Sequence, residues 1–115
     1  MQTRIPMEKL VDFGRQLLQR SNVPEKQAEK ISTHIVETEA FRQSTHGLVQ
    51  FSSILSGIDR GAFDPASSPR VVSDKAAAGL IDAGGCIPII AMDTARELAV
   101  SKAREYGIAT AIVRK

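Results

Sequence analysis

The groups best suited to chemistry lie together in residues 41–47, which read Phe-Arg-Gln-Ser-Thr-His-Gly. This segment places an imidazole, a guanidinium and two hydroxyls close together in the chain. Because an imidazole exchanges protons near neutral pH, His46 is a candidate general acid or base. Gly47 follows it and lets a ligand approach the backbone closely. The alternative is a purely structural turn, in which Ser44 or Thr45 caps the helix that follows.

Other reactive side chains give weaker signals. His34 lies within a predicted helix beside its apolar stripe, which favours a structural role, and no carboxylate joins the two histidines in a metal-ligand pattern. Cys86 is the only cysteine, so an internal disulfide is excluded, and we interpret it as a small packed residue. Gly84 and Gly85 precede a predicted helix, as in phosphate-binding loops. However, Pro88 lacks an amide donor and the third glycine of the dinucleotide fingerprint is absent.

Three amphipathic helices are predicted in the first half of the chain. They cover residues 6–20, a segment that opens at Pro24, and a segment that begins after Gly47 and stops before Gly61. Their apolar series are Leu10, Phe13 and Leu17; then Ala28, Ile31, Ile35 and Thr38; then Leu48, Phe51, Leu55 and Ile58. His46 is therefore expected in the connection between the second and third helices.

The second half of the chain predicts strands around a helix. Residues 70–73 and 78–82 are short apolar segments that could pair as a hairpin. Pro88 opens a predicted helix that runs to about Tyr106, and 108–113 is the clearest strand. The order strand, helix, strand predicts a crossover unit, with the last strand inside a mostly parallel sheet. Such a strand needs neighbours, so another chain or a longer polypeptide is expected to complete the sheet.

Composition bounds the class of protein. The chain has 115 residues, with 15 basic and 13 acidic side chains and a net charge of +2. This balance offers no basic stripe and argues against nucleic acid as a partner. No apolar run approaches the roughly 18 residues of a membrane span, and no signal-peptide core is present, so a cytoplasmic protein is predicted. We expect an α/β (α+β) fold with a helical segment at 1–60, a connection at 61–69 and the start of an α/β domain at 70–115.

Together these motifs resemble the type-2 malate/L-lactate dehydrogenase family, which includes ureidoglycolate and sulfolactate dehydrogenases. The resemblance covers the whole chain and depends on order and spacing rather than on one motif. Its features are Thr-His-Gly at 45–47, a helix ending near Gly61, Arg-Val-Val at 70–72, Ile-Asp-Ala-Gly-Gly at 81–85, an alanine-rich helix and Tyr-Gly-Ile-Ala at 106–109. It implies the N-terminal portion of an NAD(P)-dependent enzyme, a fold other than the ordinary Rossmann fold, and a homodimer.

The resemblance also implies roles for individual residues. His46 would exchange a proton with the oxygen of a small-molecule substrate, while NAD or NADP, held by segments beyond Lys115, exchanges hydride. Ser44, Thr45 and Gln50 would contact that substrate. Thr45 keeps a hydroxyl where the family has serine. Gln50 stands where many members have arginine, and so exchanges an ionic contact with a carboxylate for a neutral one.

Two functions follow as hypotheses. The first is the N-terminal part of an oxidoreductase that interconverts a 2-hydroxy acid, or a related compound, and its 2-oxo form. The 115-residue chain by itself is expected to be inactive, because the cofactor segments lie elsewhere. The second is a non-catalytic interaction or self-association domain derived from that family.

Overall fold

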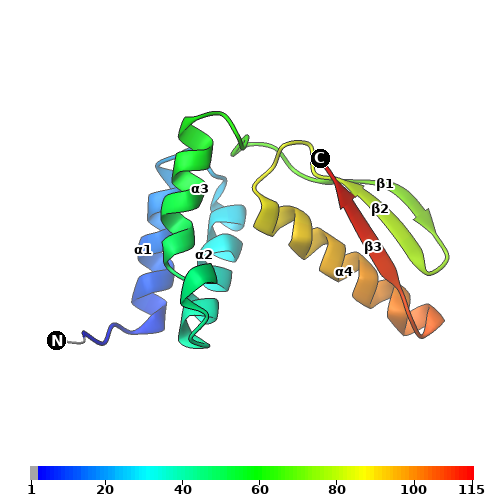
Figure 1. Cartoon of the computed structure of the whole chain (residues 1–115), viewed down its shortest axis with the longest axis horizontal. Helices are drawn as coiled ribbons and strands as arrows, with labels where there is room; N and C mark the ends of the chain where they lie inside the picture. Colours follow the sequence, from blue (N-terminus) through cyan, green and yellow to red (C-terminus); the bar gives the residue numbers. More distant parts are fainter. Residues whose placement is uncertain (1–2) are drawn as a thin grey trace. The chain divides into compact units, whose positions relative to one another are not determined.

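A computed structural model describes residues 3–115, which form helices followed by a helix-covered sheet (Figure 1). The elements are α1 (Met7–Gln19), α2 (Glu25–Ala40), the short 3-10 turn η1 (Ser44–His46), α3 (Val49–Asp59), β1 (Arg70–Lys75), β2 (Ala78–Asp82), α4 (Pro88–Tyr106) and β3 (Thr110–Arg114). Contacts divide the chain into two compact units, one ending at Ala66 and the other beginning at Ser67. The mixed content confirms the predicted α/β (α+β) class.

Prolines begin the first two helices. Pro6 and Pro24 have extended backbone angles, and their carbonyl groups accept the first helical hydrogen bonds of α1 and α2. A proline suits such a position because a helix start leaves its amide groups unpaired in any case. The predicted stripe of α2 is the face that packs, since Ala28, Ile31 and Ile35 are fully buried.

The buried face of α1 differs from the predicted apolar series. Phe13 is 64 % exposed, whereas Gly14 and Leu18 are buried. At Gly14 the backbone of α1 lies very close to Phe51 and Ser32, because a Cβ there would overlap the Phe51 ring and the hydroxyl of Ser32. Ser32 Oγ also donates a hydrogen bond to the carbonyl oxygen of Val11 at 2.6 Å. The close contact of α1 with its neighbours is therefore made at Gly14, its smallest residue. A prediction based on large apolar side chains misses this contact.

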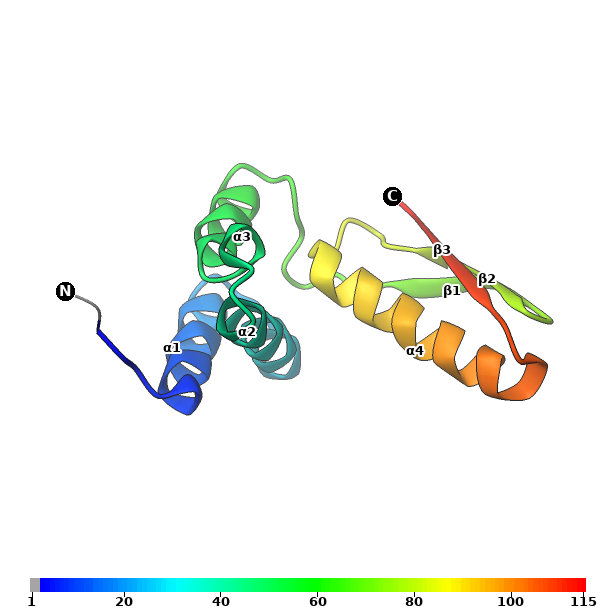
Figure 2. The same ribbon diagram turned by 60° about the horizontal axis from the view of Figure 1, so that its bottom comes forward.

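The second unit is a three-stranded mixed sheet with α4 against it (Figure 2). β1 pairs with β2 antiparallel as a hairpin, and β2 pairs with β3 in parallel, with Ala78 opposite Thr110. α4 is thus the predicted crossover between two parallel strands. The sheet is mixed, in agreement with the expected start of a mixed or parallel sheet, and among the described strands β3 is an edge strand, with Ile112 59 % exposed.

Small residues allow α4 to approach the sheet. Ala91 and Ala95 are buried, and the absence of a side chain at Gly79 makes room for Leu98. Gly107 ends α4 with a positive φ of 83°, a conformation that favours glycine. The small-residue face predicted for this helix is therefore the one that packs.

Candidate functional site

His46 is the last residue of η1, in the connection between α2 and α3. Its Nδ1 lies 3.0 Å from the hydroxyl oxygen of Thr45, and both residues are exposed. When the imidazole is protonated, Nδ1 donates to that hydroxyl and Nε2 carries the other proton. The pair therefore occupies one ring nitrogen and leaves the other for a ligand, which is the arrangement that acid/base chemistry needs.

Glu39 holds this turn from α2. Its Oε2 accepts a hydrogen bond from the backbone N–H of Leu48 at 3.0 Å, immediately before α3. Gly47 is buried against the same residue, and a Cβ there would overlap the Glu39 carboxylate. The expectation that Ser44 or Thr45 caps α3 is wrong, since α3 has no side-chain cap from its N-cap residue and Glu39 supplies the acceptor instead.

The role of Glu39 was missed at the sequence level, although one signal was present. Glu39 lies four residues after Ile35, which is fully buried, so the two residues share one face of α2. A carboxylate that continues a buried apolar stripe needs a hydrogen-bond partner inside the fold. In this protein that partner is the N–H of Leu48, which has no acceptor within α3 because it lies at the start of that helix.

Gln50 binds the turn from the other side. Its Nε2 donates to the carbonyl oxygen of Thr45 at 3.0 Å. Of the four residues predicted for the site, Thr45, His46 and Gln50 are therefore joined by hydrogen bonds. Ser44 begins the same turn, where its carbonyl oxygen accepts from the N–H of Gly47 at 3.4 Å, and its side chain is exposed.

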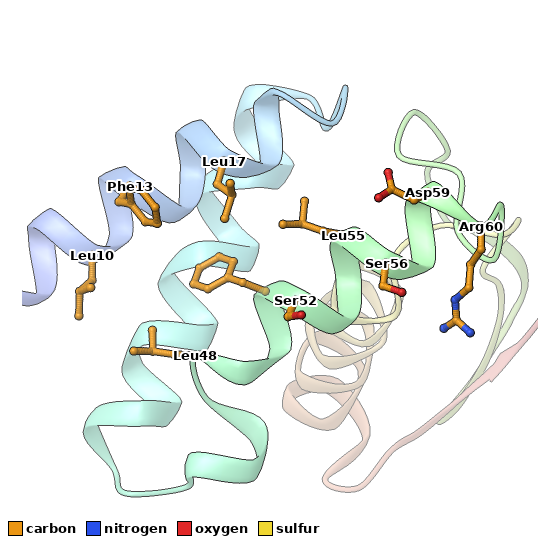
Figure 3. Close-up of a pocket in the computed structure, with 10 residues that line it drawn as sticks. Leu10, Phe13, Leu17, Leu48, Ser52, Leu55, Ser56, Asp59 and Arg60 are labelled. Carbon is orange, nitrogen blue, oxygen red and sulfur yellow. The ribbon is translucent and has the colours of Figure 1, made fainter.

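An apolar groove lies apart from this site, between α1 and α3 (Figure 3). It has a volume of about 780 Å³ and is lined by Leu10, Phe13, Leu17, Leu48, Phe51, Ser52, Leu55, Ser56, Asp59 and Arg60. The apolar series predicted for α1 therefore faces this groove. None of the four predicted site residues is among those that line it.

The turn at Gly84 and Gly85 does not fit a phosphate group. The N–H of Gly84 donates to Asp82 Oδ1 at 2.9 Å, and the N–H of Cys86 donates to the carbonyl oxygen of Ala83. Pro88 begins α4 without an N–H. Two of the amides at this turn are thus engaged and a third is missing, and the carboxylate of Asp82 would repel an anion.

The remaining candidate groups also lack features of a site. Cys86 is buried, and desolvation raises the pKa of its thiol, as expected for a packed rather than a reactive cysteine. Among residues 3–115 no group of three or more His, Cys, Asp or Glu side chains is arranged to hold a metal ion. Within the same residues, no helix is long and apolar enough to cross a membrane.

Comparison with known proteins identifies relatives along nearly the whole chain. A family profile described as "Malate/L-lactate dehydrogenase" matches residues 5–115. Malate dehydrogenase of Pyrococcus horikoshii is 25 % identical over 111 residues, which are 96 % of this chain and 31 % of the relative. The Delta(1)-pyrroline-2-carboxylate/Delta(1)-piperideine-2-carboxylate reductase of Pseudomonas putida is 28 % identical over 106 residues, 92 % of this chain and 31 % of the relative.

Solved structures of similar proteins have the same fold. The crystal structure of malate dehydrogenase from Entamoeba histolytica superposes with a TM-score of 0.90 at 18 % identity, over 99 % of this chain and 32 % of that one. The chain thus spans about a third of the length of the curated relatives that it matches.

Proposed function

Because the chain belongs to the malate/L-lactate dehydrogenase family, we propose that it is the N-terminal part of an NAD(P)-dependent oxidoreductase with His46 as its acid/base. The relatives named above are a malate dehydrogenase and a related reductase. The substrate proposed is a 2-hydroxy acid, or a related compound, and its 2-oxo form. The observation that carries the residue assignment is the pairing of His46 with Thr45 on an exposed turn that both α2 and α3 hold.

In the direction of reduction, protonated His46 acts as the general acid. Its Nδ1–H donates to Thr45 Oγ1 and orients the ring, so that Nε2–H donates to the substrate carbonyl oxygen. A nicotinamide, when bound, would supply the hydride for the carbonyl carbon. The proton on Nε2 then passes to the oxygen and produces a hydroxyl group, which leaves the imidazole neutral. In oxidation the neutral imidazole takes this proton back.

Further parts of the proposal concern the surroundings of His46. Ser44 offers a second hydroxyl to the substrate from the same turn. The residues that hold NAD or NADP lie in segments beyond Lys115, which is consistent with the engaged amides at Gly84 and Cys86. We therefore expect the 115-residue chain alone to be inactive. We also propose that the natural protein is a cytoplasmic homodimer.

Substitution of His46 tests the assigned role. In the natural protein, His46→Ala should lower kcat by about 10²- to 10⁴-fold, the usual contribution of a positioned general acid. Steady-state kinetics of the natural protein with a 2-oxo acid and a nicotinamide cofactor measure this loss. His34→Ala is the matched control, since His34 is an exposed histidine on α2. Full turnover by His46→Ala would contradict the assignment.

A second candidate function is non-catalytic association through the sheet edge. The open side of β3 supports it, because among the described strands β3 pairs only with β2. Titration of the 115-residue chain with NADH and NADPH, together with its size in solution, separates the two functions. Self-association without nucleotide binding, and without turnover by the natural protein, favours the second. Micromolar nucleotide binding by this chain would contradict the placement of the cofactor residues elsewhere.

A further inference from the structure

The four α-helices within residues 3–115 each end at a residue with a positive φ. These residues are Asn22 after α1 (65°), Arg42 after α2 (61°), Gly61 after α3 (74°) and Gly107 after α4 (83°). Glycine suits this left-handed conformation because it has no Cβ, and asparagine is the usual alternative. Arg42 is therefore the exception among the four.

Hydrogen bonds show that Arg42 occupies a regular helix cap. Its N–H donates to the carbonyl oxygen of Glu39 at 2.9 Å, and the N–H of Gln43 donates to that of Thr38 at 3.2 Å. The same pair of bonds follows α1 and α3. A glycine would thus fit at position 42 without a change in the backbone, and it would avoid the strain that an arginine has there.

No contact within the described part of the chain compensates for this strain. Ala76 also has a positive φ, but its carbonyl oxygen accepts a hydrogen bond from Lys102. Arg42 is exposed, and within residues 3–115 its guanidinium has neither a hydrogen bond nor an ion pair. Backbone strain without local support is typical of residues that act on a ligand.

Arg42 also lies on the turn that carries His46. The N–H of His46 donates to the carbonyl oxygen of Gln43 at 2.9 Å, so η1 folds back on the residue next to Arg42. Because a 3-10 helix rises by about 2 Å per residue, the backbones of Arg42 and His46 are within about 10 Å. Both side chains are exposed, and Arg42 is the only lysine or arginine in residues 41–50.

The chemistry of a 2-oxo acid matches this pair of side chains. Its carboxylate is bonded directly to the carbon of the oxo group, so the two groups need partners on the same side of the site. A guanidinium binds a carboxylate through two parallel N–H···O bonds, which fix its orientation as well as its charge. Arg42 and His46 offer these two partners from one turn.

We propose that Arg42 is a specificity-determining residue, whose guanidinium binds the carboxylate of the substrate while His46 meets the oxo group. This contact offsets the unfavourable backbone conformation at position 42. The natural protein should therefore prefer a 2-oxo acid to its amide. This inference rests on the proposed function, because it assumes that the oxo group is reduced at His46.

Arg42→Gly tests this inference in the natural protein with its nicotinamide cofactor. The variant should lower kcat/KM for pyruvate at least about tenfold, because it removes a charge-assisted contact. The kcat/KM for pyruvamide, which has no carboxylate, should stay nearly the same. The urea midpoint of the same variant should rise, since glycine relieves the left-handed strain. An arginine that only supported the turn would not produce opposite changes in activity and stability.

Two further variants make the outcomes distinct. Asn22→Gly is the matched control, because it changes the equivalent residue after α1 and should leave both kcat/KM values unchanged. Arg42→Lys keeps the charge without the bidentate geometry and should fall between wild type and Arg42→Gly.

Three results with Arg42→Gly would overturn the inference. They are an unchanged kcat/KM for pyruvate, an equal loss for pyruvate and pyruvamide, and a change confined to the KM of the nicotinamide cofactor, whose phosphates are also anions. Failure of the proposed function looks different: the wild type would reduce neither substrate, and His46→Ala would change nothing.

Discussion

At the turn that carries His46, the side chain of Glu39 occupies the space that a side chain at position 47 would need. The carboxylate of Glu39 reaches the N–H of Leu48 only because Gly47 has no side chain in its path. The candidate acid/base residue is thus held by a contact between two residues that do no chemistry themselves. This contact fixes the backbone just after His46.

Gly47→Ala should therefore destabilise the helical unit. The added Cβ would overlap the Glu39 carboxylate and touch its Cα, so Glu39 must move and leave the Leu48 N–H without its acceptor. Overpacking of this kind costs about 1–3 kcal/mol. Urea unfolding of the 115-residue chain, followed by far-UV circular dichroism, measures this loss. Ser53→Ala, at an exposed position of α3, is the control, and equal stability of the two variants would contradict the prediction.

Among the elements, the hairpin of β1 and β2 depends on a lysine from α4. Lys102 is only 7 % exposed, and its Nζ donates to the carbonyl oxygen of Ala76 at 2.7 Å and pairs with Asp74. Ala76 has a positive φ of 44°, which is unusual for a residue with a side chain. The lysine therefore stabilises a tight turn that contains neither glycine nor asparagine.

Lys102→Met should open this turn. Methionine keeps most of the apolar stem but leaves the Ala76 carbonyl without its donor, a loss of about 1–3 kcal/mol. Hydrogen exchange of the β1 and β2 amides should become faster, and the urea midpoint should fall. Lys75→Met removes an exposed lysine from the same hairpin and serves as the control. If the two variants were equally stable, the lysine contact would not support the turn.

Acid should weaken the connection from β2 to α4. The N–H of Gly84, and then the guanidinium of Arg114, hold the pKa of Asp82 below its ordinary value. A carboxyl group with a lowered pKa in the folded state stabilises the fold above its unfolded pKa, near about 4, and loses that contribution as pH falls through the folded pKa. The free energy of unfolding should therefore lose the contribution of Asp82 below about pH 4.

Asp82→Asn tests this dependence on pH. The variant should be less stable than wild type near neutral pH, and the difference should shrink as pH falls below about 4. Urea midpoints at about pH 7, 5, 4 and 3 give the comparison. Arg114→Gln should show a smaller change, because the bond from Gly84, the larger cause, remains. A difference between wild type and Asp82→Asn that stays constant with pH would contradict this account.

Across the whole chain, the connection at 61–69 is not uniform. Phe63 packs against Gly57 of α3, and its N–H bonds to the Gly57 carbonyl oxygen, so the first part of the connection belongs to the helical unit. Asp64 accepts a bond from the N–H of Ala66 within an exposed turn. Ser67 bonds to the carbonyl oxygen of Gly84 and so belongs to the second unit.

Limited proteolysis tests the proposed domains at 1–60 and 70–115. Proteinase K should cut first inside 61–69, near Asp64, because this exposed turn lies where one compact unit ends and the other begins. Mass spectrometry identifies the fragments, which should then resist further digestion. A first cut inside a helix or a strand would contradict the proposed boundaries.

Local signals in the amino-acid sequence are enough to predict the class of the fold and the order of its elements. Apolar spacing, prolines at helix starts and Gly107 act over a few residues, so their effect can be read locally. The hairpin is only weakly indicated, because its turn at Ala76 has no glycine or asparagine. The resemblance to a family also comes from the sequence, because it depends on the order of motifs along the chain.

Several contacts emerge only from the tertiary structure. Glu39 caps α3 from another helix, Gly14 rather than Phe13 makes the close contact of α1, and Lys102 is buried against a distant turn. The edge position of β3 and the Gln50 bond to Thr45 belong to the same group of findings. Each depends on which residues meet after folding. Such contacts are set by packing and by the pairing of buried polar groups; spacing along the chain places Glu39 on the buried face of α2 but does not identify its partner.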